Sequence, residues 1–417
     1  MKKILSLALA FLVIPLLQGC GHNNGPLPVA DYSTHRTIQA SPNMTSEYSV
    51  PAIRELPTLQ EQPANAKEVK VGLLLPMTGP SAELGRSLLE AAQMGLFDKY
   101  ASIPANRKRA QIVLMPKDTG GTPAGARKAA EEAAASGVKL LIGPVFSAEV
   151  KGAAPIAQKN DLRLITFSNN PEVAGEGVYL FGFAPDEQAK RVLREAFLRT
   201  QGRVGVLVPN NEYGKIVAQA AREIAVLNNK QLVGVELYEP TGSDLNNRID
   251  SLLDGIDMKN DPQLDAVMLA EGAPNINNVL ARLAIENVTN QNVALLGTGL
   301  WDDPSLLGNP SLVGGMFAGS PITLKHRFED RYVKQYKHTP PRLASLAYDA
   351  VALAATIAET GDYDFTDASF TAPNGFSGPA NGIFRFKDSG QIERGLAILA
   401  IGPKDFIQFA PSPASFQ

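Results

Sequence analysis

The stretch VKVGLLLPMTGP at residues 69–80 decides the fold. Its first part, residues 69–75, is a short apolar run that stops at Pro76, which is typical of a strand buried on both faces. The tripeptide TGP at 78–80 predicts a turn. Beyond the turn, apolar and small residues recur at helical spacing, at Leu84, Leu88, Ala91, Ala92, Gly95 and Leu96. A buried strand followed directly by such a helix predicts an α/β fold.

The alternation of strand and helix continues along the chain. In a first series, strands are predicted at 112–115, 140–142 and 162–166, with helices at 124–136 and 148–158. In a second series, which begins after Pro185, helices are predicted at 187–200, 214–227, 245–253 and 276–285, and strands at 204–208, 232–238, 266–269 and 293–296. Parallel strands need crossovers of this length, so two parallel sheets flanked by helices are expected.

The last part of the chain completes the expected architecture. A strand is predicted at 315–319 and helices at 324–336 and 345–359. Residues 383–386 are expected to pair with 396–401 as a hairpin around KDSG. The fold class expected is α/β, with two lobes that face each other as a clamshell and close about a hinge. Ligands of doubly wound sheets bind outside the carboxyl ends of the strands, so the cleft between the lobes is the expected site.

Composition limits the possible function classes. The chain has 39 Lys and Arg against 42 Asp and Glu, a net charge of −3, so it lacks the basic excess of a nucleic-acid-binding protein. A single cysteine excludes an internal disulfide and a cysteine-based zinc site. Four scattered histidines leave little for metal or acid–base chemistry. A non-enzymatic binding or interaction protein without a cofactor is therefore expected.

The N-terminus predicts export. Lys2 and Lys3 precede an apolar run at 4–17 that is shorter than the roughly 20 residues of a membrane-spanning helix. The run ends at Gly19 and Cys20, which indicates a signal peptide over 1–19. The placement of Cys20 resembles a bacterial lipobox and implies cleavage before it and its acylation; the alternative is an ordinary signal peptide with an incidental cysteine. Since Gly21 rather than Asp follows, the resemblance to Gram-negative lipoproteins implies the periplasmic face of the outer membrane.

Residues 20–67 are expected to hold the body away from the lipid. This segment carries six prolines among Asn, Ser, Thr and Gln, without a sustained strand or helix period. Too few apolar residues are present to offset the entropy of ordering, so a disordered, proline-rich tether is predicted.

The body contains the motifs VGLLLPMTGP at 71–80, LLIGPVFS at 140–147, ITFSNNPE at 165–172 and NEYG at 211–214. Together they resemble type I periplasmic binding proteins of the Leu/Ile/Val-binding class. Two more, GPANG at 378–382 and FKDSGQIERGL at 386–396, are similar to a lipoprotein subgroup that includes activators of penicillin-binding proteins. The resemblance covers 68–403 and leaves 404–417 as a C-terminal tail. It implies three crossings between the lobes, with lobe 1 at about 68–183 and 321–381 and lobe 2 at about 184–320 and 382–403.

The resemblance also suggests which residues contact a ligand. In the amino-acid receptors a Ser hydroxyl and backbone N–H groups at a helix N-terminus hold the ligand carboxylate. Ser147 matches that position, and its alternative role is a plain N-cap. Ser168 and Asn169 match a second polar contact or are turn residues before a proline. Tyr213 matches an aromatic that closes over the ligand, or else packs at a helix start.

The sequence departs from the receptors where they bind the ligand's amino group. No carboxylate stands at 297–299, where the receptors carry an acidic residue, and an aromatic pair expected near 272–273 is missing. Glu271 lies next to the missing pair, and Trp301 is a candidate shield, with core packing as its alternative. An ammonium buried without a partner would cost several kcal/mol, so amino-acid specificity does not follow from the resemblance.

Two functions remain open. The first is a receptor that binds a small polar, amino-acid-like solute between its lobes and delivers it to an ABC permease. The second is a regulator of peptidoglycan synthesis, similar to penicillin-binding protein activators, in which the clamshell contacts a peptidoglycan synthase. Both place the protein in the cell envelope, held by its N-terminal lipid, and neither involves nucleic acid.

Overall fold

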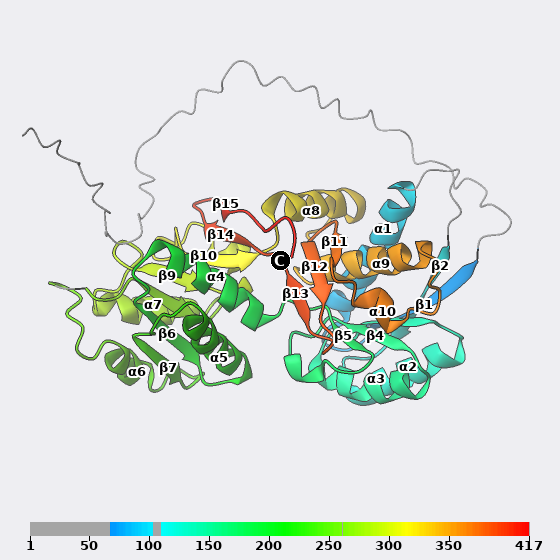
Figure 1. Cartoon of the computed structure of the whole chain (residues 1–417), viewed down its shortest axis with the longest axis horizontal. Coiled ribbons are helices and arrows are strands. Elements are labelled where there is room, and N and C mark those ends of the chain that lie inside the picture. The colour runs from blue at the N-terminus through cyan, green and yellow to red at the C-terminus, as the bar shows by residue number, and fades with distance from the viewer. Residues whose placement is uncertain (1–66, 103–109, 261, 417) are drawn as a thin grey trace, which may run out of the picture.

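The computed structural model describes residues 67–102, 110–260 and 262–416, and in it the alternating elements form two α/β lobes side by side (Figure 1). Residues 1–66, with Cys20 and the expected tether, lie outside the described residues. Among the described helices, none combines the length and the apolar character needed to cross a membrane. The expected fold class, parallel sheets flanked by helices in two lobes, is confirmed.

Lobe 1 is built on a parallel sheet in the order β2-β1-β3-β4-β5. Its strands are β1 (Glu68–Leu75), β2 (Gln111–Asp118), β3 (Leu140–Ile142), β4 (Arg163–Thr166) and β5 (Val178–Leu180). Its helices are α1 (Ala82–Ser102), α2 (Pro123–Ala135), α3 (Ser147–Lys159), α9 (Ala344–Glu359), α10 (Asp367–Phe370) and the short η1 (Pro171–Val173). One core lies between the sheet and α2 and α3, and the other contains α1 and the almost wholly buried α9.

Lobe 2 is built on a sheet in the order β15-β14-β10-β9-β8-β6-β7. Its strands are β6 (Val204–Pro209), β7 (Gly234–Tyr238), β8 (Ala266–Leu269), β9 (Ala294–Gly297), β10 (Met316–Gly319), β14 (Ala397–Ile401) and β15 (Phe406–Ala410). Its helices are α4 (Pro185–Arg199), α5 (Glu212–Leu227), α6 (Leu245–Leu252), α7 (Ile276–Ile285), η2 (Gly299–Trp301) and η3 (Pro304–Leu306). Helices α4 and α5 cover one face, and α6 and α7 cover the other.

Three predictions about the C-terminal part are wrong. β12 (Gly382–Phe386) pairs with β13 (Ile392–Arg394) and with β11 (Phe376–Gly378), not with 396–401. Phe384 and Phe386 of this small sheet pack against Phe181 in the core of lobe 1, so the chain re-enters lobe 2 after β13 and not at 382. The expected tail contains β15, which pairs with β14 at the edge of the lobe 2 sheet. Strand β13 is too short and too polar to be found by its hydrophobic pattern.

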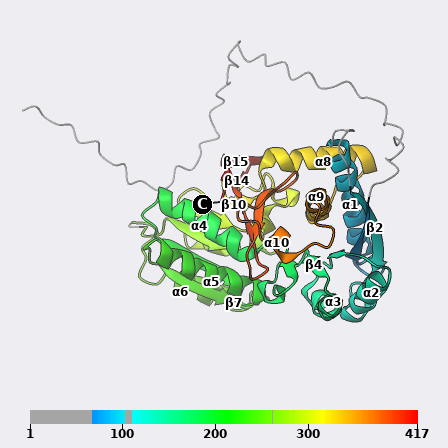
Figure 2. The same cartoon turned by 45° about the vertical axis from the view of Figure 1, so that its right-hand side comes forward.

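Helix α8 (Ile322–Tyr336) bridges the two lobes, and Figure 2 shows it along their upper side. Near its start, Lys325 pairs with Asp302 of lobe 2. Near its end, Arg331 pairs with Asp98 of α1, with Nε 3.0 Å from Oδ2. The helix therefore follows the second crossing as a link between the lobes.

The third crossing is tied to the first by a buried arginine. Arg394 at the end of β13 donates from Nη2 to the carbonyl of Phe181 and from Nε to that of Gly182, at 3.5 Å. Its guanidinium lies 4.7 Å from the centroid of the Phe181 ring. Burial lowers the pKa of Arg394 to about 10. A cation this deeply buried is stabilised by the two carbonyls and the aromatic face.

The second crossing is tied to the same region by amide and carboxylate contacts. Ser320 Oγ donates to Asn381 Oδ1 at 2.8 Å, and Asn381 Nδ2 donates to Asp349 Oδ2 at 2.8 Å. Asp349 also accepts from the backbone N–H of Ala380 at 2.8 Å. Burial raises the pKa of Asp349 to about 6, while these hydrogen bonds and Arg394 oppose the rise. We call Ser320, Asp349, Asn381 and Arg394 the hinge cluster.

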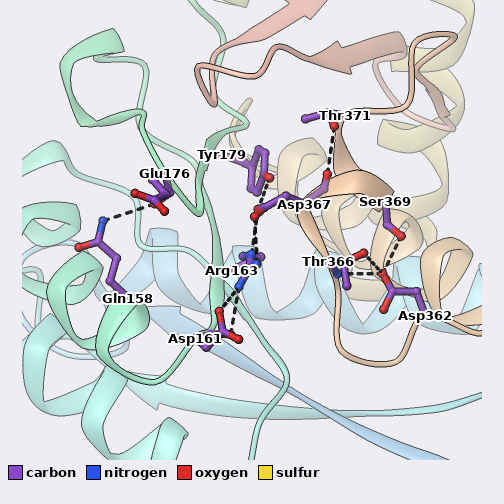
Figure 3. A network of polar contacts seen from close by, with 10 residues as sticks. All are labelled: Gln158, Asp161, Arg163, Glu176, Tyr179, Asp362, Thr366, Asp367, Ser369 and Thr371. Carbon is purple, nitrogen blue, oxygen red and sulfur yellow. Dashed lines mark hydrogen bonds and ion pairs between the residues drawn. The ribbon is translucent and has the colours of Figure 1, made fainter.

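A polar network at the opposite end of the lobe 1 sheet fixes α10 (Figure 3). Arg163, at the start of β4, donates from Nε and Nη2 to the two carboxylate oxygens of Asp367, at 2.8 and 2.9 Å. Tyr179 donates its hydroxyl to the same carboxylate at 2.5 Å. The Arg163 hydrogen bond is the main cause that lowers the pKa of Asp367. The segment after α9 is thereby held against β4 and β5, away from the cleft.

Candidate site between the lobes

The carboxyl ends of the strands of the two lobes meet across the molecule. Asn170, in the loop after β4, donates its Nδ2 to Glu212 Oε1 at the start of α5, at 2.6 Å. The Asn170 Oδ1 also accepts from the Glu172 backbone N–H at 2.9 Å, which fixes the amide. The loops after β4 and β6 are therefore in contact, as expected for a site at the carboxyl ends of facing sheets.

Ser147 is the first residue of α3 and is half-buried, but it is not the N-cap. The N-cap is Phe146, whose backbone N–H donates to Glu149 Oε2 at 3.0 Å. No hydrogen bond of the Ser147 hydroxyl is found within the described part of the chain. The position of Ser147 at a helix N-terminus therefore leaves the hydroxyl available to a ligand.

Glu149 was not anticipated from the sequence and is fully buried behind this loop. Its carboxylate accepts from the hydroxyl of Thr119, which follows β2, and from Phe146 N–H. Burial raises the pKa of Glu149, and the hydrogen bonds oppose the rise. Its position two residues after Ser147 matches the N3 position of a capping box, which is the signal that could have identified it.

The two polar contacts predicted in the loop after β4 lie in different surroundings. Ser168 is buried and its Oγ accepts from the Asn170 backbone N–H at 3.2 Å, so it supports the turn. Asn169 is exposed. The neighbouring Asn170, which the sequence did not single out, makes the contact to lobe 2 instead.

Tyr213 joins α5 to the loop after β9. Its hydroxyl donates to Thr298 Oγ1 at 2.8 Å, and Thr298 is fully buried. Burial raises the pKa of Tyr213, and the positive charge of Arg342 acts in the opposite direction. Thr298 lies in the region where the receptors carry their acidic residue, and it offers a hydroxyl in place of a carboxylate.

Glu271 and Trp301 form a connected pair within lobe 2. Glu271 Oε2 accepts from the Tyr238 hydroxyl at 2.8 Å, and its backbone carbonyl accepts from Trp301 Nε1 at 2.9 Å. Trp301 is fully buried in the lobe 2 core. Its indole supports the loops after β8 and β9 from behind, which corresponds to the packing alternative.

Arg342 was missed by sequence reasoning and lies where lobe 1 approaches lobe 2. Its guanidinium carbon is 4.5 Å from the centroid of the Phe183 ring, at the first crossing. A Cβ built on Gly299 would lie 2.7 Å from Arg342 Nη1 and 2.8 Å from Gln188 Nε2. Gln188 Oε1 accepts from the Gly299 N–H at 2.8 Å. The arginine lies two residues before the start of α9 and belongs to no motif, so only the folded chain reveals it.

The described residues contain no group of three or more His, Cys, Asp or Glu side chains that could hold a metal ion. Hydroxyl, amide, carboxylate and guanidinium groups lie on the loops between the two sheets.

Comparison with known proteins gives distant relatives. An uncharacterized protein of Rickettsia prowazekii, RP748, is 24% identical over 214 residues, which is 51% of this chain and 55% of that protein. The Leu/Ile/Val-binding protein BraC3 of Rhizobium johnstonii is 26% identical over 168 residues, 39% of this chain and 44% of the relative. The matches thus span about half the length of these relatives.

Solved structures share the fold over most of both chains. The leucine binding protein LivK of Thermotoga maritima is 21% identical, with a TM-score of 0.59 over 83% of this chain and 99% of that one. An ABC transporter solute binding protein of Rhodopseudomonas palustris, in complex with 3,4-dihydroxybenzoic acid, is 18% identical, with a TM-score of 0.60 over 84% and 98%. A family model described as periplasmic binding protein matches residues 68–404, and the chain therefore belongs to the periplasmic binding protein family.

Proposed function

We propose that this protein binds a small polar solute between its lobes and delivers it to an ABC permease. The observation that carries the proposal is the meeting of polar side chains from facing loops: Asn170 with Glu212, Tyr213 with Thr298, and Arg342 beside Gly299. The relatives support it, since they include a Leu/Ile/Val-binding protein and structures of a leucine binding protein and a benzoate-bound solute binding protein.

The proposed mechanism of solute binding is closure of the two lobes about the three crossings. A solute that contacts both lobes stabilises the closed arrangement, and its apparent affinity depends on how often the free protein closes. Ser147, Ser168 and Asn169 on lobe 1, with Tyr213 and Glu271 on lobe 2, are the residues proposed around the solute. Trp301 supports the lobe 2 loops and is assigned no direct contact.

Calorimetry of the purified full chain with leucine, isoleucine, valine and 3,4-dihydroxybenzoate tests the proposal. Binding of one of them with a Kd below about 10 μM is expected. Ser147→Ala should weaken this binding, whereas Ser136→Ala, at the far end of α2, should not. Absence of binding by the whole set, with a correctly folded protein, contradicts a receptor for amino acids or aromatic acids.

The proposal places the protein in the cell envelope, anchored through acylated Cys20 on the periplasmic face of the outer membrane. Membership of the periplasmic binding protein family supports the envelope location. Cys20→Ser should move the protein from the membrane fraction to the soluble periplasmic fraction. Unchanged membrane fractionation of the variant would contradict the lipid anchor.

Regulation of a peptidoglycan synthase is the second candidate. It is favoured by the loops that hold the amino group in the receptors, because 297–299 carries no acid and Glu271 already accepts from Tyr238. Pull-down of a purified penicillin-binding synthase by the anchored protein, combined with no solute binding, would support this function and exclude the receptor.

A further inference from the structure

We propose that Arg342 is the anchor for a carboxylate on the bound solute and selects organic acids that lack an α-ammonium group. This inference rests on the proposed solute-binding function and names the class of solute. In this arrangement the carboxylate of the solute binds near Phe183 and the first crossing, and not at Ser147 alone.

Arg342 has its charge unpaired and its position fixed. No ion pair joins it to an acidic side chain of the described residues, although Asp302 and Glu329 line the same small cavity. Both of these carboxylates lie near Lys325, which pairs with Asp302 and is 3.8 Å from Glu329. The guanidinium carbon lies 4.5 Å from the centroid of the Phe183 ring, a cation–π contact that restrains the side chain. A restrained, unpaired guanidinium is a suitable partner for a carboxylate.

Glycine at 299 makes room for this cation. A side chain there would meet Arg342 Nη1 at 2.7 Å, so the guanidinium is in close approach to the backbone of the loop after β9. This is the loop in which the amino-acid receptors carry an acid for the ligand's ammonium. Here the same place has a positive charge, and the adjacent Thr298 and Tyr213 are neutral. A guanidinium therefore lies beside the loop that carries a carboxylate in an ammonium-binding site.

Space for the body of a solute adjoins Arg342. The cavity that Arg342 itself lines is only about 20 Å³, room for about one water. It shares Pro340 and Pro341 with a groove of about 470 Å³ that Arg342 does not itself line and that is also lined by Ser81, Glu83, Leu84 and His338. This volume lies within the range of small-molecule sites. Pro80 and Ser81 follow β1, so the groove lies at the carboxyl end of that strand.

Two of the acids near this cleft are already engaged in hydrogen bonds, while Glu83 is exposed on the groove. Glu271 accepts from Tyr238 at 2.8 Å and from the Gly272 N–H at 3.2 Å, and Glu212 accepts from Asn170 at 2.6 Å. An α-ammonium adjacent to a carboxylate that binds Arg342 would lie close to the guanidinium, and like charges disfavour such binding. A hydroxyl, oxo or hydrogen substituent in its place carries no such penalty.

The experiment uses two matched ligand pairs and the full chain. 4-Methylpentanoate differs from leucine by the missing ammonium, and 4-hydroxybenzoate differs from 4-hydroxybenzamide in its charge. Binding is followed by calorimetry and by fluorescence of Trp301, the single tryptophan of the sequence, which lies two residues after Gly299. We expect the acid to bind at least about tenfold more tightly than the amide, and 4-methylpentanoate more tightly than leucine.

Substitutions assign the selectivity to Arg342. Arg342→Gln should remove the difference between acid and amide, and Arg342→Lys should retain part of it. Arg327→Gln, which removes the same charge from an exposed position on α8, should change neither. Tighter binding of leucine than of 4-methylpentanoate, or an acid preference that survives Arg342→Gln, overturns the inference and leaves the receptor proposal standing. Absence of binding by all four probes overturns both.

Discussion

At the scale of single residues, Gly297 shows how backbone space fixes the lobe 2 side of the site. A Cβ built on Gly297 would lie 2.1 Å from the Trp301 indole, far inside contact distance. The indole in turn donates to the Glu271 carbonyl, so the loops after β8 and β9 depend on this close approach. Glycine is thus required at 297 by packing and not by a turn.

Gly297→Ala should therefore lower the free energy of unfolding by about 1–3 kcal/mol, because overpacking displaces a fully buried tryptophan. Urea unfolding followed by Trp301 fluorescence measures the loss, and the native emission maximum should also shift. Gly175→Ala is the control, since a Cβ at Gly175 meets no atom within 4 Å. Equal stability of the two variants would contradict the packing role of Gly297.

Asp349 in the hinge cluster predicts a pH dependence of stability. Burial raises its pKa to about 6 from an ordinary value of 3.8. Between these two values the folded protein holds a proton that the unfolded chain has released, so the free energy of unfolding falls as pH rises. Because of Asp349, the free energy of unfolding should fall by about 3 kcal/mol between pH 3.8 and about pH 6.

Asp349→Asn cannot titrate and should lack this contribution. Urea unfolding of the wild-type protein and the variant at several pH values between 4 and 7 provides the test. The difference between the two free energies should change with pH and level off above pH 6 or so. Parallel curves across the whole range would show that Asp349 does not titrate in this window.

At the scale of elements, the four-residue α10 depends on a salt bridge more than on helix propensity. Asp367 accepts two hydrogen bonds from Arg163 and one from Tyr179 (Figure 3). Since Arg163 lowers the pKa of Asp367, the stabilisation is present above the unfolded pKa and is lost as pH falls through the lower folded value.

Asp367→Asn should lower the free energy of unfolding at pH 7 by about 1–2 kcal/mol. This loss is smaller than for a buried pair because the carboxylate is half-exposed and screened by solvent. Asp364→Asn removes an acid from the same segment, where Lys139 lies 2.7 Å away and both side chains are exposed. It should cost less than about 0.5 kcal/mol. A double-mutant cycle with Arg163→Gln checks that the larger loss comes from the pair; zero coupling would assign it elsewhere.

At the scale of the whole molecule, the lobes are joined by the crossings, by α8 and by contacts across the cleft. The Asn170–Glu212 hydrogen bond is a cleft contact, at 2.6 Å. Glu212 is exposed, and its side chain makes no other hydrogen bond or ion pair within the described part of the chain, so its removal breaks this one side-chain bond.

Glu212→Ala should shift the free protein towards more open arrangements, seen as a larger radius of gyration in small-angle scattering. Solute affinity should fall by a few-fold, because the closed state becomes less populated. Glu131→Ala removes the same charge from an exposed position on α2 and should leave the scattering unchanged. Identical scattering for both variants would mean that the Asn170–Glu212 contact does not hold the lobes together.

A residue of the candidate site could be predicted from the sequence only where a local motif contains it. Tyr213 and Ser147 were proposed because the motifs NEYG and LLIGPVFS resemble those of the receptor family. Asn170, Thr298 and Arg342 were not proposed, since their roles come from partners far away in sequence. Gln188 and Gly299, for example, are 111 positions apart and share a hydrogen bond.

The sequence by itself determined the α/β class, nearly all strands and helices of both sheets, and the polar loops at their carboxyl ends. These features follow from hydrophobic period and turn chemistry, which act over a few residues. Tertiary structure alone decided that the chain returns to lobe 2 after β13, that Trp301 is core, and that Arg342 lies over Gly299. Each of these outcomes depends on which surfaces pack together, and packing joins residues whose separation along the chain leaves no periodic trace.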